Sequence, residues 1–542
     1  MKTYKRIGEL LIEQGIINED TAIMTVAEQK VSYRKFGDLL VENNMASEHD
    51  IARALSEQYS VKYVDVNTIS VMPEAVISVP EDLARKHHIL PVSIKNKILT
   101  VVISDPLNID AIKEIEFHIS MKVQPFIGAK GAILEAIKHH YRFDASIEPI
   151  TDISANAAAL PDIEPDIVKD EISAPIIKLV NLLISEAVES RASDIHIEPS
   201  REYVTVRFRI DGVLIERTRL HPWLHSPIVS RIKILARLNI AERRLPQDGG
   251  FRIRSGGKDI DARVSTIPVS GGEKVVIRIL DQSHTEVNLE NLGLSEQDFI
   301  RMESLIARKK GIILVTGPTG SGKTTTLYAI INRIKSSMTN IVTVEDPIEY
   351  NIAGINQVQV RSGIGLTFAK CLRSILRQDP DVILVGEIRD EETAEIAFRA
   401  AMTGHLVLST LHTNDAISTI TRLIDIGIPP YIIASTVVGI IAQRLVRQLC
   451  PSCKKKDASA YSPNGCYMCS RTGFYGRTGI FEIFTITPEI KELIVSEKPE
   501  ETIKAAAKKL SKGTLSDDAF SKVNQGITTR EEIYRVIETD IF

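Results

Sequence analysis

The chain has 542 residues, of which 66 are Lys or Arg and 70 are Asp or Glu, so its formal net charge is −4. This length corresponds to three or four domains. Hydrophobic residues make up 44% and charged residues 25%, which excludes a disordered, collagen-like or disulfide-rich chain. The near-neutral balance also argues against a nucleic-acid coat protein, which carries a basic excess.

The N-terminus is not typical of a secretory signal, because charged residues interrupt the segment MKTYKRIGELLIEQG. The longest charge-free apolar stretch, residues 426–443, contains Pro429, Pro430 and Gly439. We therefore expect a buried helix after a turn there, and no membrane span. Only five Cys are present, which is not a secreted disulfide framework. These features indicate a cytoplasmic protein.

The first predicted domain, residues 1–143, opens with an internal repeat. Residues 6–29 align with residues 35–58, and seven of the 24 positions are identical. Each copy predicts two short helices, the second of which begins at Asn18 or Ser47. Ser47 and Asp50 fit a capping box. A strand over 98–104 and a helix over 109–119 follow. The repeat is also consistent with a duplicated hairpin used only for packing.

Composition changes sharply after this domain. Residues 144–171 contain eight acidic residues, one Lys and three Pro, which predicts an acidic flexible linker. We assign residues 172–288 to an α+β domain with a helix over 176–190. Strands over 204–210 and 213–217 flank Asp211-Gly212, a hairpin signal. Another strand is predicted over 275–280, before a boundary near 285–295.

Residues 289–542 alternate apolar strands with helical segments, which predicts a mostly parallel α/β sheet. The expected strands cover 311–316, 340–344, 382–385 and 406–410. A glycine-rich loop follows the first strand and precedes a helical segment over 325–334. It matches the pattern G-x-x-x-x-G-K-[ST], and its residues are Gly317, Pro318, Thr319, Gly320, Ser321, Gly322, Lys323 and Thr324.

This loop predicts an ATP site that also includes Thr325. Glycines let backbone N–H groups approach phosphate oxygens, and the helix N-terminus favours negative charge. We expect Lys323 to reach the β- and γ-phosphates and the Thr324 hydroxyl to bind Mg²⁺.

A hydrolase also needs a carboxylate that orients water. Glu387 ends an apolar strand and is our candidate, because strand ends at one sheet edge meet the nucleotide crevice. Gly386 stands where many P-loop enzymes hold Mg²⁺ with an Asp. Further carboxylates at a strand end are Glu345, Asp346 and Glu349. Each acid taken singly is also consistent with a solvated cap or turn.

Histidines and arginines complete the candidate site. His405 and His412 bracket an apolar strand and are candidates to sense the γ-phosphate or to relay between subunits. Transferred phosphoryl charge requires cations, and the candidates are Arg263, Arg278, Arg373 and Arg377. Taken one at a time, these arginines are equally explained by surface ion pairs.

Four cysteines form two C-x₂-C pairs separated by twelve residues, within a subdomain that we assign to 446–480. They are Cys450, Cys453, Cys466 and Cys469. Four thiolates at this spacing suit tetrahedral Zn²⁺ and leave no open position for catalysis, so the predicted metal is structural. Disulfides are disfavoured in a cytoplasmic chain.

In order along the chain, GPTGSGKT, TVEDPIEY, DVILVGEIRD and TGHLVLSTLHTNDA closely resemble the type II secretion and type IV pilus assembly ATPases (the GspE/PilB family) over about residues 170–542. The resemblance implies a RecA-like P-loop core behind a PAS-like α+β domain, and a homo-hexamer with nucleotide sites between subunits. It also implies that Glu387 is catalytic, with Lys323 and Glu345, and that Arg263 and Arg278 reach the nucleotide. Glu345, Asp346 and Glu349 then form an acidic box, and His405 and His412 a histidine box.

The N-terminal repeat resembles a cyclic di-GMP-binding module of the MshEN type, whose pattern begins R-[LI]-G-x-x-L. The matching positions are Arg6, Gly8, Leu10, Leu11 and Gln29 in the first copy, Gly37, Leu39, Leu40 and Gln58 in the second, and Asp105 downstream. The second copy departs at Lys35, Phe36 and Asn44. Lys35 lacks the planar fork of Arg, and a docking domain without a ligand is the alternative.

The resemblance thus predicts an ATP-hydrolysing motor that extrudes pilins or pseudopilins at the inner face of the cytoplasmic membrane. Its cofactors would be ATP, Mg²⁺ and structural Zn²⁺, with cyclic di-GMP as an effector, and its partners would be inner-membrane platform and docking proteins. A related nucleic-acid translocase is the alternative, because residues 231–254 hold seven Lys or Arg against two acids. That segment has a single aromatic residue, which supplies poor base stacking. A nucleotide switch without turnover is disfavoured by Glu387.

Overall fold

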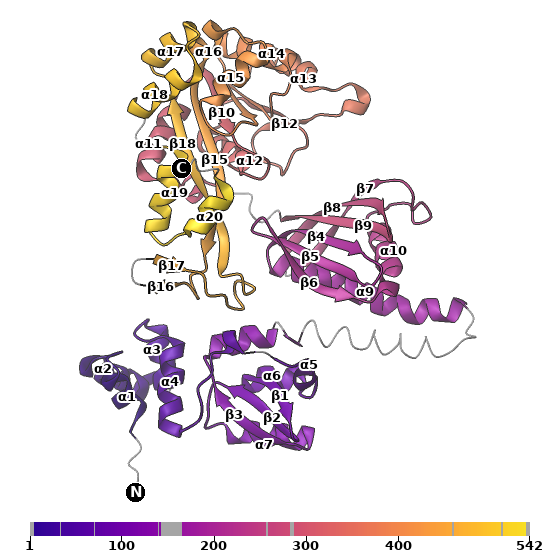
Figure 1. The fold of residues 1–542 in the computed structure, drawn as a ribbon, viewed down its shortest axis with the longest axis vertical. Helices are drawn as coiled ribbons and strands as arrows, with labels where there is room; N and C mark the ends of the chain where they lie inside the picture. Colours follow the sequence, from indigo (N-terminus) through magenta and orange to yellow (C-terminus); the bar gives the residue numbers. More distant parts are fainter. Residues whose placement is uncertain are drawn as a thin grey trace.

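The computed structural model describes residues 5–32, 34–69, 71–138, 140–141, 165–255, 258–281, 287–457, 460–510 and 513–537. They form an N-terminal module, an α+β domain and a larger α/β domain with a small cysteine-bearing extension (Figure 1). Most of the predicted linker, namely residues 144–164 of 144–171, lies outside the described residues, as do residues 142–143. Among the described residues, no helix has both the length and the apolar character needed to span a membrane.

The internal repeat folds as two helical hairpins. The helices are α1 (Ile7–Glu13), α2 (Glu19–Ser32), α3 (Phe36–Glu42) and α4 (Glu48–Tyr59). The second helix of each copy begins where the sequence predicts, because the Asn18 side chain accepts from Thr21 N at 2.8 Å and Ser47 forms a capping box with Asp50.

The rest of the N-terminal module is a three-stranded sheet in the order β1-β2-β3 with helices on it. Its elements are η1 (Val66–Thr68), α5 (Pro73–Ile77), α6 (Glu81–His87), β1 (Ile89–Lys95), β2 (Ile98–Ile103), α7 (Ile109–Ile119) and β3 (Lys122–Ile127), followed by a helix over 130–138. The predicted strand over 98–104 and helix over 109–119 are β2 and α7.

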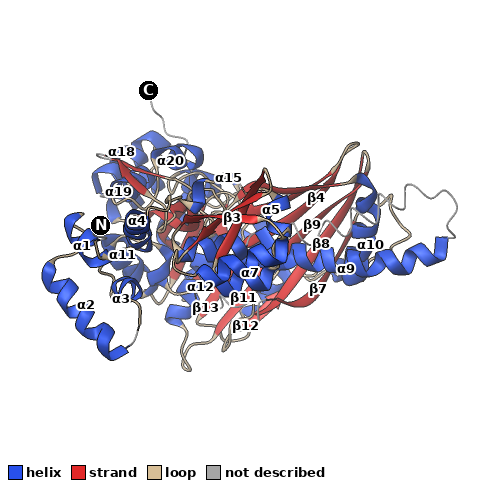
Figure 2. Cartoon of the chain, turned by 90° about the horizontal axis from the view of Figure 1, so that it is seen from below, coloured by secondary structure: helices blue, strands red, loops and turns tan. Residues whose placement is uncertain are grey.

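The α+β domain is an antiparallel six-stranded sheet in the order β6-β5-β4-β9-β8-β7. Helix α9 (Pro165–Glu189) begins within the segment that the sequence assigns to the linker, and it extends beyond the edge of the sheet (Figure 2). The other elements are β4 (Ala192–Pro199), β5 (Val204–Ile210), β6 (Val213–Leu220), η2 (Pro222–Leu224), α10 (His225–Leu235), β7 (Gln247–Ser255), β8 (Lys258–Val269) and β9 (Gly272–Asp281).

The predicted hairpin between β5 and β6 is present. Asp211 and Gly212 have φ of 49° and 87°, the left-handed conformation that a two-residue turn between twisted strands requires. Apolar residues of α9 and α10, such as Leu179, Ile228 and Ile232, pack on alternating residues of the sheet and form the core of this domain.

The α/β domain is built on a seven-stranded sheet in the order β12-β11-β13-β14-β10-β15-β18. Its strands are parallel except for β18, which is antiparallel to β15. The strands are β10 (Gly311–Thr316), β11 (Ile341–Glu345), β12 (Asn356–Gln359), β13 (Val382–Val385), β14 (Leu406–Leu411), β15 (Val437–Leu449) and β18 (Phe474–Thr485). The four strands predicted from the sequence are therefore β10, β11, β13 and β14.

Helices cover both faces of this sheet. They are η4 (Leu289–Leu292), α11 (Glu296–Ile306), α12 (Lys323–Ile334), η5 (Ser362–Ile364), α13 (Phe368–Ile375), α14 (Glu391–Met402), α15 (Ser418–Asp425), α16 (Pro430–Thr436), α17 (Pro488–Val495), α18 (Glu500–Leu510), α19 (Leu515–Asn524) and α20 (Arg530–Val536). Ile312 and Leu314 of β10 enter the core on one face, whereas Ile313 and Val315 enter the core on the other. This alternation explains why β10 is apolar throughout.

One expectation is corrected. Residues 426–443 do not form a single buried helix, because only α16 is helical and the chain then enters strand β15, which lies between β10 and β18. Val437 has an extended backbone, and Pro429 and Pro430 begin the short helix. The β15–β18 hairpin extends beyond the sheet, and its tip carries the cysteines and the short strands β16 (Lys455–Asp457) and β17 (Ala460–Ser462).

Candidate active site and metal centre

The glycine-rich loop connects β10 to α12 in the geometry that binds phosphate. Gly317, Gly320 and Gly322 all have positive φ, and a Cβ on Gly317 would lie 2.4 Å from the carbonyl oxygen of Gln443. Only glycine fits there. Because Lys323, Thr324 and Thr325 form the first turn of α12, their N–H groups lie at a helix N-terminus, where an anion is favoured.

Lys323 is the cation of this loop. Its Nζ donates to the carbonyl oxygens of Gly317 at 2.8 Å and Pro318 at 3.0 Å. Burial, and then the positive charge of Arg444, lower the pKa of Lys323 to about 8, while Glu387 opposes the shift. Because this site is shielded from water and already positive, a bound polyphosphate stabilises the Lys323 ammonium more than it would stabilise a solvated ammonium.

Glu387 lies at the same sheet edge as this loop. It follows β13, which lies next to β14 and is separated from β10 only by β14, so the carboxyl ends of these parallel strands meet. The Glu387 side chain is only 13% exposed. Arg389 Nη2 lies 2.6 Å from its Oε1, and His412 Nε2 lies 3.6 Å from its Oε2. A buried carboxylate with a basic neighbour can polarise a water molecule.

The two predicted histidines lie at opposite ends of β14. His412 follows the strand and contacts Glu387. His405 precedes the strand, and its Nδ1 donates to the carbonyl of Ala400 at 2.8 Å, at the end of α14. The structure therefore brings His412, and not His405, to the nucleotide edge. Burial and Lys323 lower the pKa of His412, while Glu387 raises it.

The acidic segment at the end of β11 divides into one buried and two exposed carboxylates. Glu345 is 3% exposed and accepts hydrogen bonds from the hydroxyls of Tyr328 and Thr343 and from Gln357 Nε2. This network raises the pKa of Tyr328, after burial as the main cause. Asp346 and Glu349 are exposed. All three acids lie near the site, but Glu345 is fully engaged by its neighbours.

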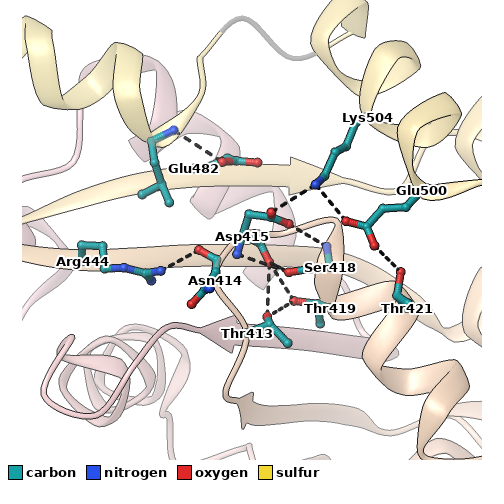
Figure 3. Close-up of polar contacts among 11 residues, drawn as sticks. Thr413, Asn414, Asp415, Ser418, Thr419, Thr421, Arg444, Glu482, Glu500 and Lys504 are labelled. Atoms are coloured by element: carbon teal, nitrogen blue, oxygen red, sulfur yellow. Dashed lines mark hydrogen bonds and ion pairs between the residues drawn. The ribbon is translucent and has the colours of Figure 1, made fainter. Parts of the chain in front are cut away.

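The loop after β14 is fastened to the end of β10, to β15 and to α18. Figure 3 shows its contacts with Arg444 of β15 and Lys504 of α18. Thr413 Oγ1 lies 2.5 Å from Thr316 Oγ1, immediately before Gly317. Arg444 Nη2 donates to the Asn414 carbonyl at 2.7 Å. Asp415 accepts from Ser418 N at 2.6 Å and lies 3.6 Å from Lys504 Nζ of α18.

Sequence reasoning missed two cations of this site. Arg444 is 8% exposed in β15, shortly after the apolar run 437–442, and lies beside Gly317. A charge shortly after an apolar run was the available signal. Arg389 follows Glu387 by two residues, and extended residues two apart share a face.

The four predicted arginines have different surroundings. Arg263 of β8 donates from Nη2 to the Ile348 carbonyl at 3.3 Å, so it reaches the acidic segment of the α/β domain. Arg278 lies opposite Arg263 in the β8–β9 pair and bonds Asp194 Oδ1 at 3.1 Å, with its side chain 62% exposed. Arg373 pairs with Glu392 on the helical surface, and Arg377 bonds back to the Arg373 carbonyl. Of these four arginines, Arg263 is the one with a contact in the acidic segment near the candidate site among the described residues.

The four predicted cysteine ligands form one cluster, and all their Sγ atoms lie within 4.8 Å of one another. The Sγ atoms of Cys450 and Cys466 are 3.8 Å apart, as are those of Cys453 and Cys469. A tetrahedron with Zn–S bonds of about 2.3 Å has edges of about 3.8 Å. The N–H groups of Cys466 and Gly473 also point at Cys469 Sγ, as expected around a thiolate ligand. This donor set fits Zn²⁺, which would hold the hairpin tip together.

In the N-terminal repeat, the matched leucines are core residues. Their side chains are 0–4% exposed, and the residues are Leu10, Leu11, Leu39 and Leu40. A Cβ added at Gly37 would lie 2.8 Å from Ile51. Arg6 is exposed, Gln29 donates to the Arg34 carbonyl, Gln58 is half-buried, and Gly8 packs near Phe36. Lys35 Nζ lies 2.5 Å from Asp105 Oδ2, so these two polar candidates pair with each other.

A phosphate-binding loop between a buried parallel strand and a helix, with a largely enclosed carboxylate two strands away, defines a P-loop nucleoside triphosphatase. Comparison with known proteins identifies the group. The chain matches the Type II/IV secretion system protein family over residues 169–535, and it belongs to that family. Residues 59–147 match the MshEN domain, directly after the repeat.

Relatives match far beyond the P-loop. The type IV pilus assembly ATPase PilB of Myxococcus xanthus is 41% identical over 97% of this chain and 98% of its own length. The type II secretion system ATPase E of Vibrio cholerae is 48% identical over 71% of this chain and 80% of its own length. The solved structure of the Legionella pneumophila ATPase DotB is 25% identical, covers 66% of this chain and 94% of that one, and has a TM-score of 0.52. The chain is therefore a P-loop ATPase with a RecA-like core, a preceding α+β domain and an MshEN domain.

Proposed function

We propose that this chain is the subunit of a homo-hexameric motor that couples ATP hydrolysis to the assembly of a type IV pilus or a type II secretion pseudopilus at the inner membrane. The observation that carries the proposal is the position of Glu387 at the P-loop edge, in a chain of this family. The match to a PilB along nearly the whole chain supports pilus assembly. Platform and docking proteins of the membrane machine would be its partners.

In the proposed reaction, the P-loop N–H groups and Lys323 hold the phosphates, and the Thr324 hydroxyl would hold Mg²⁺. Mg²⁺, when bound, neutralises charge that develops on the phosphate oxygens. Glu387 orients the attacking water, and Arg389 and His412 position its carboxylate. Arg263 and the exposed Arg278 are candidates to reach the nucleotide of this subunit or a neighbouring one, which gives hexamer formation a role in turnover.

The test is Glu387→Gln, with Glu395→Gln on the exposed face of α14 as a matched control. We expect Glu387→Gln to bind a fluorescent ATP analogue normally and to lose at least about a hundredfold in phosphate release, because general-base catalysis contributes that much. The control should retain the wild-type rate. An unimpaired rate in Glu387→Gln would refute this mechanism, and a monomer with ATP and Mg²⁺ in mass photometry would refute the hexamer.

We also propose that cyclic di-GMP regulates the motor through the N-terminal module. The MshEN match and the Arg6-Ile7-Gly8 pattern support this. Lys35 and Asp105 pair with each other, so ligand binding would have to exchange that ion pair for contacts with guanine or phosphate. Calorimetry with cyclic di-GMP should show binding that Arg6→Ala weakens about tenfold and that a change at the exposed Lys122 of β3, Lys122→Ala, leaves unaltered. No heat at high micromolar ligand would remove the effector from the proposal.

A further inference from the structure

An aromatic residue between the cysteines of the second pair packs outside its own subdomain. Tyr467 stands between Cys466 and Cys469, and its side chain is 7% exposed. It packs into the hydrophobic core of the N-terminal module, among residues such as Val66 and Val76, and not into the core of the ATPase domain. In Figure 1 the hairpin tip that bears the cysteines faces the N-terminal module.

Polar contacts fix this tyrosine from both sides. Tyr467 N donates to Asn67 Oδ1 at 3.3 Å, and His140 Nε2 lies 3.2 Å from the Tyr467 hydroxyl. The His140 and Tyr467 rings are edge-to-face with centroids 5.8 Å apart. Arg471 Nη2 donates to the same hydroxyl at 2.9 Å and to the Ile69 carbonyl at 3.5 Å.

The contact has the composition of a binding hot spot. A buried tyrosine ring, its satisfied hydroxyl and a neighbouring arginine are the residue types that dominate interface energies. A cavity of about 1080 Å³ beside it separates the module from α9 of the α+β domain, with Lys138 on one side and Lys178 and Arg217 on the other. The N-terminal module and α9 therefore do not meet across this cavity, and the contact described above is made by residues 466–471, here called the knuckle.

The shape of the knuckle depends on its thiolates. Cys466 and Cys469 Sγ lie 3.7 Å apart, and the chain between them turns so that Tyr467 points outward. A metal that holds these sulfurs also holds the backbone of Tyr467.

We propose that the knuckle formed by residues 466–471 is the docking element that holds the N-terminal module on the ATPase domain, and that metal loading and docking are coupled. A loop whose conformation depends on the bound metal thus links the N-terminal module to the ATPase domain. By linkage, any ligand that binds the docked and undocked module with different affinities must change the docking equilibrium by the same factor.

The test is hydrogen exchange of the full-length, zinc-loaded protein, followed by mass spectrometry. Tyr467→Ala should speed exchange about tenfold or more in peptides that cover 62–76 and 130–141, because exchange there follows the population of the undocked state. Tyr461→Ala is the matched control, since Tyr461 lies in the same subdomain but contacts Gly526 and Lys454. It should leave both module peptides unchanged. Zinc content, measured by metal analysis, should stay at one ion per chain in both variants.

Asn67→Ala removes a hydrogen-bond acceptor of Tyr467 on the N-terminal module and leaves the metal ligands unchanged. It should raise hydrogen exchange in the knuckle peptide 464–471. A chelator should raise exchange of the module peptides in the wild type and add little in Tyr467→Ala. The proposal is overturned if Tyr467→Ala exchanges like the wild type, if Tyr461→Ala has the same effect, or if protection appears only at concentrations where chains associate. Full module protection after zinc removal would overturn the coupling to the metal. No cyclic di-GMP is present in these measurements, so their outcome is independent of effector binding.

Discussion

At the scale of single residues, the acidic segment separates residues that the sequence treats alike. Glu345 and Glu387 both follow apolar strands, yet Glu345 is enclosed by Tyr328, Thr343 and Gln357. All three are donors, so an amide at this position would turn an N–H₂ group toward at least one donor. An unsatisfied buried group of this kind costs about 1–3 kcal/mol.

We therefore expect Glu345→Gln to lower the free energy of unfolding by about 1–3 kcal/mol, while Glu387→Gln leaves it nearly unchanged. Chemical denaturation of both variants in parallel measures the difference. If Glu345→Gln has wild-type stability and only loses turnover, its role is catalytic and the packing argument fails.

His412 gives a prediction about pH. Its pKa is lowered from the usual value near 6.5 by burial and by Lys323, so it is neutral at pH 7 and becomes a cation only as the pH falls further. The cation would pair with Glu387 and weaken that carboxylate as a water-orienting base. We expect kcat to fall as the pH drops below about 6.5, and to fall less steeply in His412→Gln. Identical acid limbs in the two proteins would contradict this role, since both share the ionisation of ATP.

The sequence was sufficient for the residues whose chemistry depends on local order. The P-loop glycines, Lys323 and the cysteine pairs are read from spacing alone, because neighbours in the chain form those sites. It could not show that His412 contacts Glu387, because that contact depends on β13 and β14 being neighbours in the sheet. Nor could it show that Asp105 meets Lys35, a contact between residues 70 positions apart.

At the scale of elements, β18 carries a carboxylate under the C-terminal helices. Glu482 lies below α19, accepts only from Leu515 N at 3.4 Å among the hydrogen bonds found in the described residues, and has Asp415, Asp517 and Lys504 nearby (Figure 3). Burial, helped by Asp415, raises the pKa of Glu482 to about 7. The folded state thus favours its protonated form.

This raised pKa makes stability fall as the pH rises from about 4.5 to about 7, because the unfolded chain releases the Glu482 proton earlier. Glu482→Gln removes that penalty. We expect its stability relative to the wild type to increase by about 2 kcal/mol between pH 5.5 and pH 8.5, since each pKa unit is worth about 1.4 kcal/mol. Denaturation at both pH values measures this, with the exposed Glu489→Gln of α17 as control. A pH-independent difference would show that Glu482 is not buried as a carboxylic acid.

Helices, turns and strands that depend on neighbouring residues in the chain were predictable from the sequence. Those that depend on pairing with distant strands were not. The capped helices α2 and α4, the Asp211-Gly212 hairpin and strands β10 and β13 follow from caps, turn residues and apolar runs. Residues 437–443 were expected to be helical. They form a strand instead, because β10 on one side and β18 on the other supply backbone partners that local propensity cannot show.

At the scale of the whole molecule, the chain is a set of separate cores joined at few points. The described cores of the α+β and ATPase domains include no buried residue of the N-terminal module, and the cores of that module include from the rest of the chain only Tyr467. Within the described residues, the cysteine-bearing hairpin is thus the element through which the cores of the N-terminal module and the rest of the chain are connected.

This separation predicts the effect of removing residues 1–141. Because the P-loop, Glu387, His412 and both faces of the central sheet lie outside the module, the shortened chain should fold and hydrolyse ATP with kcat within about threefold of the full-length protein. Its ATPase domain should keep its melting temperature within a few degrees in calorimetry, since no buried strand or helix of its cores is lost. The segment 464–471 should exchange hydrogen faster, because Tyr467 becomes exposed, while the β15–β18 pairing stays protected. Loss of cooperative unfolding in the ATPase domain would mean that the module contributes to its folding, and the division into separate cores would then be wrong.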